Sequence, residues 1–228
     1  MESAKYMANV MTAANLLFGG LSIFLALTGS YVPAAWLIFF STICDIGDGK
    51  IARLSGGNSE FGKQFDSLAD LVSFVIAPAV LIFTLDREPF LLWRFLVCLL
   101  AIFCGAFRLA RFNTEAEDKI ALFFNGLPTP GFGAMVASFA LVQHKYNLPI
   151  DPQIISAAIA ILAMMMVSRI KYPTFKEEPL FQWQYLLSFA IILTMLFIRP
   201  ELTVLAISFV YVFLLPVKAS LKTGGKKR

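Results

Sequence analysis

Long apolar runs of similar length follow one another along most of the chain, and short polar stretches separate them. A helix needs about 20 mostly apolar residues to cross the hydrocarbon core of a bilayer. Eight runs come close to this length, so the pattern predicts an all-α, polytopic bundle of about eight transmembrane helices. The predicted spans cover residues 9–29, 32–53, 62–84, 89–112, 127–144, 152–170, 181–198 and 201–218.

Composition agrees with a membrane protein. Hydrophobic residues make up 58% of the 228 residues and charged residues 15%, and the mean hydropathy is +0.75. A soluble domain is about 45–50% apolar and about 25% charged. We therefore expect a single integral membrane domain over residues 1–228, which ends in a basic tail at 219–228 and leaves no room for a sizeable soluble domain.

Basic residues are distributed unevenly between the two sides of the predicted bundle. If the N-terminus is cytoplasmic, 15 lysines and arginines fall on the cytoplasmic side and 4 on the other. Such an excess marks the cytoplasmic side of membrane proteins. We expect both termini on the cytoplasmic side of a prokaryotic inner membrane, with the net charge of +4 facing membrane lipids. Nucleic acid is an unlikely partner on this reading, because the basic residues are spread over five segments.

Four aspartates lie inside the second and third predicted spans. Asp45 and Asp48 are three residues apart and Asp66 and Asp70 are four apart, so each pair shares one helix face. If the two spans form an antiparallel hairpin, Asp45 meets Asp70 and Asp48 meets Asp66, because both pairs are centred on the turn at residues 56–58. We expect the four carboxylates to converge within the cytoplasmic leaflet.

Carboxylates at this depth are costly and are usually functional. They cannot all stay ionised without a compensating cation, and oxygen ligands without His or Cys suit Mg²⁺, Mn²⁺ or Ca²⁺. Four acids exceed what one magnesium usually takes from protein, so we expect two divalent cations of the kind that assist phosphoryl transfer. Simple salt bridges to Lys50, Arg53 and Lys63 are a structural alternative. A cation channel or transporter is a functional one, but it would spread the acids along a path across the membrane.

The spacing Asp45-x2-Asp48-Gly49-x2-Ala52-Arg53-x8-Gly62-x3-Asp66-x3-Asp70 resembles the complete signature of the CDP-alcohol phosphotransferase family. Further stretches are similar to the phosphatidylserine synthase branch of that family. With Thr12 and Asn15 in the first span, the likeness extends over about 165 residues. The stretches are FDSLADLVSFVIAPA (65–79), RLARFN (108–113), GLPTP (126–130) and VSRIKYPTFK (167–176).

The resemblance implies a six-helix core over about residues 1–175, with two additional helices at about 181–218. It also implies a homodimer and a polar cavity open to the cytoplasm. Two divalent ions would be held by Asp45, Asp48, Asp66 and Asp70, and Asp70 would also be the general base. CDP-diacylglycerol would be bound through its nucleotide by Asn15, Asp48, Gly49, Ala52, Arg53 and Gly62. Glycines suit such a site because they let a ligand approach the backbone closely.

The implied acceptor is L-serine, which would give phosphatidylserine and CMP. Arg108 and Arg111 lie three residues apart and could bind the serine carboxylate or the lipid phosphate, although anchoring at the cytoplasmic surface also explains two arginines there. Thr129 could contact substrate or simply begin a helix. Asn15 could serve helix packing or contact the cytosine. Glycerol 3-phosphate and inositol phosphate remain alternative acceptors.

Overall fold

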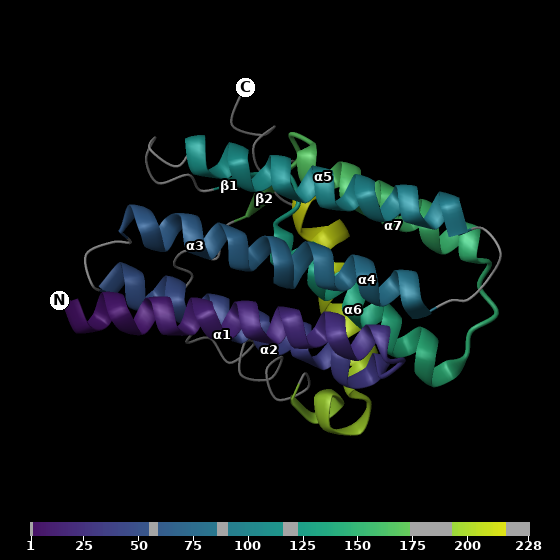
Figure 1. The fold of residues 1–228 in the computed structure, drawn as a ribbon. Helices are drawn as coiled ribbons and strands as arrows, with labels where there is room; N and C mark the ends of the chain where they lie inside the picture. Colours follow the sequence, from purple (N-terminus) through teal and green to yellow (C-terminus); the bar gives the residue numbers. More distant parts are fainter. Residues whose placement is uncertain (1, 55–58, 86–90, 116–122, 174–192, 218–228) are drawn as a thin grey trace.

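The computed structural model describes residues 2–54, 59–85, 91–115, 123–173 and 193–217, and it consists mainly of helices that run side by side (Figure 1). Two of the helical segments, η1 and η2, are π-helical turns. The elements are α1 (Glu2–Leu27), α2 (Tyr31–Leu54), α3 (Glu60–Leu71), η1 (Val72–Ile76), α4 (Ala77–Leu85), α5 (Leu91–Glu115), β1 (Phe123–Asn125), α6 (Thr129–Tyr146), α7 (Pro152–Val167), β2 (Lys171–Pro173), α9 (Pro200–Phe209) and η2 (Val210–Leu214).

The predicted spans coincide with helices wherever the structure describes them. The third span is one continuous helical segment made of α3, η1 and α4, and the eighth is α9 with η2. Of the seventh span only residues 193–198 are described, and they are helical. The tail at 219–228 lies outside the described residues. By length and composition, four described segments suffice to cross a membrane: Tyr6–Leu27, Glu60–Leu85, Leu92–Thr114 and Pro200–Val217.

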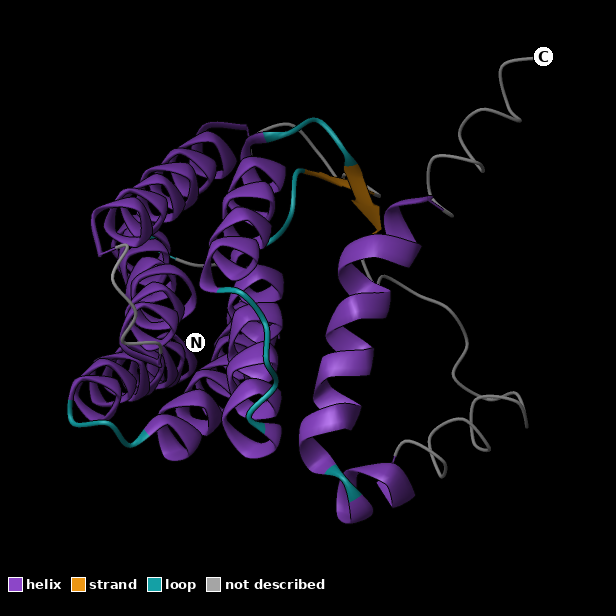
Figure 2. Ribbon diagram, turned by 90° about the vertical axis from the view of Figure 1, so that its right-hand side faces the viewer, coloured by secondary structure: helices purple, strands orange, loops and turns teal. Residues whose placement is uncertain are grey.

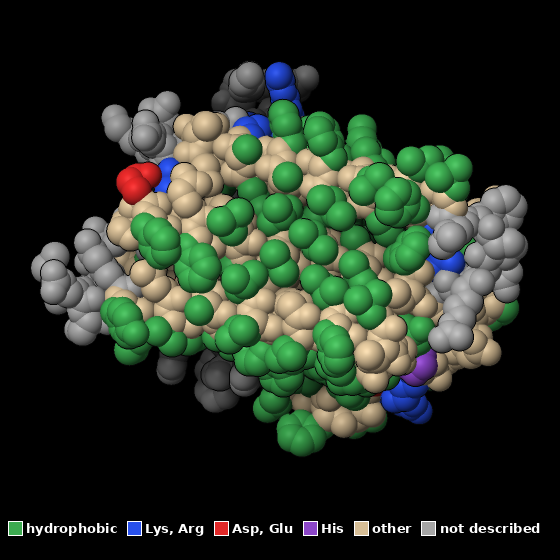
Figure 3. Space-filling model, viewed as in Figure 1, with side chains coloured by type: hydrophobic (Ala, Val, Ile, Leu, Met, Phe, Trp, Pro, Cys, Tyr) green, Lys and Arg blue, Asp and Glu red, His purple; other side chains and the backbone are tan. Residues whose placement is uncertain are grey.

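Large apolar side chains cover the middle of the face seen in Figure 3, and the few charged side chains visible there lie along its margins. This surface is built from α1, α3, α4 and α5. An apolar belt with charged ends is what a bilayer requires of a spanning bundle. The exposed side chains of these helices include Leu17, Phe24, Leu68, Leu96 and Phe103.

The second and third spans pack against each other as expected, through contacts of α2 with η1 and α4, but α1 packs more extensively against both spans. Helix α1 lies against α2 and also against α3, η1 and α4, whereas α3 packs mainly against α1 and α5. The turn at residues 56–58 is outside the described residues. The two aspartate-bearing helices therefore face each other with α1 in contact with both, and α1 becomes part of the site.

A short pair of strands departs from the purely helical expectation. β1 and β2 run antiparallel, with Phe124 opposite Tyr172. They join the segment before α6 to the segment after α7. The pairing places the Tyr172 side chain, which is fully buried, against the C-terminal helix, where its hydroxyl donates to the Val212 carbonyl at 3.1 Å.

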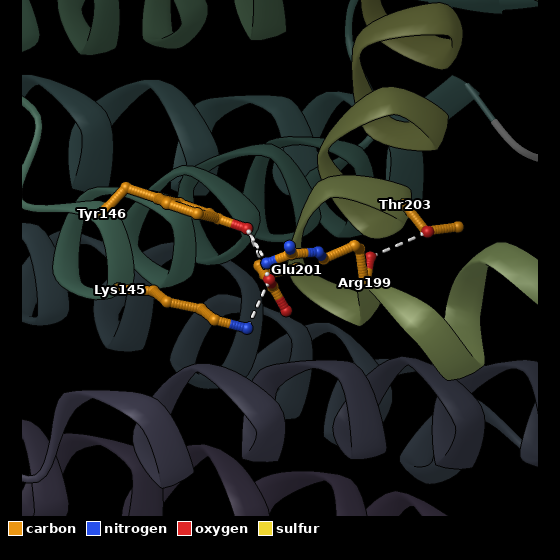
Figure 4. Close-up of polar contacts among 5 residues, drawn as sticks. All are labelled: Lys145, Tyr146, Arg199, Glu201 and Thr203. Atoms are coloured by element: carbon orange, nitrogen blue, oxygen red, sulfur yellow. Dashed lines mark hydrogen bonds and ion pairs between the residues drawn. The ribbon is translucent and has the colours of Figure 1, made fainter.

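Helix α9 stands at the side of the bundle (Figure 2) and packs against α6. A buried carboxylate fixes its first turn to the last turn of α6 (Figure 4). Glu201, only 5% exposed, accepts from Lys145 Nζ at 2.6 Å and from the Tyr146 hydroxyl at 2.9 Å. Arg199 donates to the same hydroxyl at 3.3 Å, and Thr203 donates to the Arg199 carbonyl at 2.9 Å. Because the Lys145 side chain is 48% exposed, only the Glu201 end of this ion pair is buried.

The π-helical turn η1 is held by glycines from three neighbouring helices. A Cβ added at Gly19 of α1 would lie 2.7 Å from the Ser73 Cα, so only glycine fits there. Small residues allow this kind of close backbone approach in membrane bundles. Similar contacts join Gly105 of α5 to Val75 and Gly133 of α6 to Phe74. The turn begins directly after Leu71, so these contacts fix the helix that carries Asp66 and Asp70.

Gly19→Ala should destabilise the protein by about 1–3 kcal/mol, because the added methyl group overpacks the contact with Ser73. Gly20→Ala is the matched control, since a Cβ there meets nothing within 4 Å. The thermal unfolding midpoint in detergent measures the difference. Equal midpoints for the two variants would show that the contact with η1 is not tight.

Candidate active site

Three of the four aspartates meet between α2 and α3. Asp45, Asp48 and Asp66 each offer a carboxylate oxygen, and these oxygens lie within 4.8 Å of one another. Asp48 is 5% exposed, and Asp66 Oδ1 is buried without a hydrogen-bond partner. An oxygen-only cluster containing an orphaned carboxylate oxygen fits a hard divalent cation such as Mg²⁺, Mn²⁺ or Ca²⁺.

Asp70 lies one turn after Asp66 and is not among the three clustered residues. Its Oδ1 accepts from Asn15 Nδ2 at 3.3 Å. Asn15 is fully buried, and its Oδ1 has no partner. The Asn15 carbonyl accepts from Ser41 Oγ at 3.2 Å and from Ser73 Oγ at 2.8 Å. Asn15 thus links α1 to α2 and to η1 while its side chain reaches Asp70.

The polar face of α1 supplies a second contact to the acids. Thr12 Oγ1 donates to Asp48 Oδ2 at 2.8 Å, and both groups are buried. Because Thr12 and Asn15 are three residues apart, they share one helix face. One face of α1 therefore orients Asp48 and Asp70 together. The sequence offered a signal for this, namely two polar residues within an apolar span.

No lysine or arginine forms an ion pair with these acids in the part of the chain that the structure describes, although Arg108 is near enough to Asp45 and Asp70 for an electrostatic interaction. The one ion pair found there is Lys145–Glu201. Lys63 Nζ instead donates to the Asn113 carbonyl at 3.0 Å, and Lys50 is exposed. The Arg53 side chain lies outside the described residues. The alternative in which Lys50 and Lys63 form salt bridges to the aspartates is therefore not supported by this geometry.

The small residues predicted to face the nucleotide occupy different surroundings. A Cβ on Gly49 would meet nothing within 4 Å, so packing does not require glycine there and space is left beside Asp48. Gly62 is buried, and its N–H donates to the hydroxyl of Ser59, the N-cap of α3, at 3.0 Å. Ala52 is 5% exposed.

Arg108 and Arg111 end α5 near the acids but have different partners. Arg108 is 7% exposed; its Nη1 donates to Thr129 Oγ1 at 3.1 Å, and its buried Nε has no partner. Arg111 donates to the Val167 carbonyl at 3.0 Å and to the Asn125 carbonyl at 2.7 Å. The guanidinium of Arg111 thus ties α5 to neighbouring backbone, whereas Arg108 keeps an unused donor.

Tyr211 is a neighbour of this site that the sequence analysis missed. It lies in η2, where its ring is so near Gly131 that an added Cβ would be 2.7 Å from Cε1. Its phenol is near enough to Arg108 for an electrostatic interaction. The Tyr172 ring packs beside it, with centroids 6.1 Å apart. The apolar run around Tyr211 gave no signal, because its contacts depend on how α9 docks.

Comparison with known proteins adds an independent line of support. Residues 5–170 match the family model described as CDP-alcohol phosphatidyltransferase. A Helicobacter pylori protein named CDP-diacylglycerol–serine O-phosphatidyltransferase is 34% identical over 196 residues, covering 84% of this chain and 81% of its own length. A Bacillus subtilis protein of the same name is 31% identical, with coverages of 76% and 93%. The archaetidylserine synthase of Methanothermobacter thermautotrophicus is 35% identical, with coverages of 72% and 68%.

Thr12→Val should weaken Mn²⁺ binding about fivefold, because losing the hydrogen bond that orients Asp48 costs about 1 kcal/mol. Thr12→Ser keeps the hydroxyl and should bind as the wild type does. Titration followed by the Mn²⁺ electron paramagnetic resonance signal gives both affinities. Indistinguishable affinities for the Val and Ser variants would contradict this role of Thr12.

Proposed function

Because this chain belongs to the CDP-alcohol phosphatidyltransferase family, we propose that it transfers the phosphatidyl group of CDP-diacylglycerol to the hydroxyl of L-serine. The products are phosphatidylserine and CMP. The observation that carries the proposal is the cluster of Asp45, Asp48 and Asp66, whose oxygens approach within 4.8 Å inside an apolar bundle. The names of the similar bacterial proteins support serine as the acceptor.

The four aspartates have two roles in this proposal. Asp45, Asp48, Asp66 and Asp70 hold two divalent cations, Mg²⁺ or Mn²⁺. When bound, the cations neutralise the pyrophosphate and stabilise the charge on the departing CMP. The nucleotide lies near Asn15, Asp48, Gly49, Ala52, Arg53 and Gly62. The open space beside Gly49 supports this placement.

Asp70 is the general base of the proposed reaction. The serine hydroxyl oxygen forms a bond to the phosphorus that carries diacylglycerol, and the bond from that phosphorus to the oxygen of CMP breaks. The hydroxyl proton passes to an Asp70 carboxylate oxygen. The hydrogen bond from Asn15 to Asp70 Oδ1 supports the assignment, because it holds the carboxylate in one orientation.

Arg108 is a stronger candidate than Arg111 for binding the anionic group of the acceptor or of the lipid. Its buried Nε has no partner, and Thr129 holds its Nη1. A carboxylate can take two parallel hydrogen bonds from a guanidinium. Arg111 is already engaged with backbone carbonyls, so its contribution is to position the end of α5.

The reaction takes place on the cytoplasmic side, where soluble serine is available while the acyl chains stay in the bilayer. The aspartates share their end of the bundle with Arg108, Arg111 and Lys171, which supports this orientation under the positive-inside rule. The active form is a homodimer in the inner membrane of a prokaryote, as the family resemblance implies.

Purified protein incubated with CDP-diacylglycerol and Mn²⁺ should release CMP with L-serine and much less with glycerol 3-phosphate or inositol phosphate. CMP measured against this acceptor panel tests the proposal directly. CMP release with glycerol 3-phosphate but not with serine would overturn the assignment of serine as the acceptor. If none of the acceptors leads to CMP release, the enzyme assignment is overturned and the transporter alternative is favoured.

Asp70→Asn serves as the matched variant in this assay. It should abolish CMP release while the protein still binds the nucleotide, because the amide keeps the size of the side chain and loses the base. Near-full activity of Asp70→Asn would contradict its role as the base even if serine proves to be the acceptor.

A further inference from the structure

A cavity lies at the end of the bundle opposite the aspartates. Its volume is about 710 Å³, and it opens between the C-terminal ends of α4 and α6 and the N-terminal ends of α5 and α7. Asp70 and Leu85 are 15 residues apart on one helical segment, or roughly 22 Å at about 1.5 Å per residue. The cavity is therefore separate from the proposed active site. Its polar lining includes Arg94, Gln143, His144, Asn147, Asp151 and Gln153.

Arg94 places a buried positive charge on the wall of this cavity. It is 6% exposed, and its Nη2 donates to the Ile82 carbonyl at 3.3 Å and to the Phe83 carbonyl at 2.6 Å. Among the described residues no carboxylate forms an ion pair with it, although Asp151 lines the same cavity. A buried cation without a counterion carries a desolvation cost that an anion in the cavity would offset.

Gln143 provides a second unsatisfied group in the same cavity. Its Nε2 donates to the Leu148 carbonyl at 2.9 Å, but its Oε1 is buried and has no partner. A buried acceptor without a donor keeps the full cost of its desolvation. Asp151 supplies no donor, because a carboxylate only accepts hydrogen bonds, and one of its oxygens accepts from the Gln153 N–H at the start of α7. Among the described residues, Arg94 thus has no ion-pair partner and Gln143 Oε1 has no donor.

We propose that this cavity binds the headgroup of a phospholipid from the leaflet opposite the aspartates. The phosphate diester lies against Arg94, and a hydroxyl or amino group of the headgroup donates to Gln143. The position supports a lipid, because Leu85 and Leu92 end two candidate membrane spans here, at the level where headgroups lie. Aliphatic side chains such as Ile155 and Ile159 also line the cavity and suit the glycerol backbone.

The test measures the thermal unfolding midpoint of the full chain in detergent with dihexanoyl phosphatidylglycerol or with inorganic phosphate. The short-chain lipid should raise the wild-type midpoint by about 3 °C, the shift that a ligand near ten times its Kd gives a chain of this size. Arg94→Gln should lose the shift. Arg199→Gln is the matched control, since Arg199 is an exposed arginine at the same end that does not line the cavity.

Three results would overturn the proposal. These are no shift in the wild type, an equal shift in Arg94→Gln, or a shift from inorganic phosphate as large as that from the lipid at the same concentration. The last result would assign the cavity to a free anion. If Arg94→Gln does not fold, Gln143→Glu replaces it. That variant adds a negative charge to the wall, so it should also lose the shift, and a retained shift would contradict the proposal.

Discussion

Mutual repulsion of closely spaced carboxylates within an apolar bundle is the constraint on which this structure depends. Asp45, Asp48 and Asp66 bring oxygens within 4.8 Å of one another among apolar helices, and no lysine or arginine of the described chain forms an ion pair with them. Such a cluster stays ionised only when cations lie among the oxygens. The proposed phosphatidyl transfer uses the same cations to neutralise a pyrophosphate, so the feature that is costly for folding is the one that performs the chemistry.

The neighbouring elements hold these acids in place. On one face of α1, Thr12 donates a hydrogen bond to Asp48 and Asn15 donates one to Asp70. The Asn15 carbonyl also accepts hydrogen bonds from serine hydroxyls of α2 and η1. Glycines at the contacts with η1 bring three helices close to the segment that carries Asp66 and Asp70. Arg108 adds a positive charge beside the acids, and the C-terminal helix brings Tyr211 to it. The site is therefore preorganised by packing across the whole bundle.

Sequence alone predicted the helical fold and the convergence of Asp45, Asp48 and Asp66, because run length and helical spacing are local properties. The aspartates were recognisable from acids in apolar surroundings, and Asn15 from a polar side chain within a span. The position of α1 against both aspartate helices, the pairing of β1 with β2 and the neighbourhood of Tyr211 could not be predicted. They depend on contacts between segments far apart in the chain, which no hydrophobic period encodes. The partners of Arg111 were missed for the same reason, since they are backbone carbonyls.

Anomalous scattering from crystals grown with Mn²⁺ is the most direct test of the central claim that the aspartates hold divalent cations. The account predicts two peaks about 3.5–4 Å apart, in contact with carboxylate oxygens of Asp45, Asp48, Asp66 and Asp70. Absence of manganese there in protein that is active with Mn²⁺ would contradict the claim. A lysine or arginine bridging the carboxylates in the place of the metal would contradict it as well.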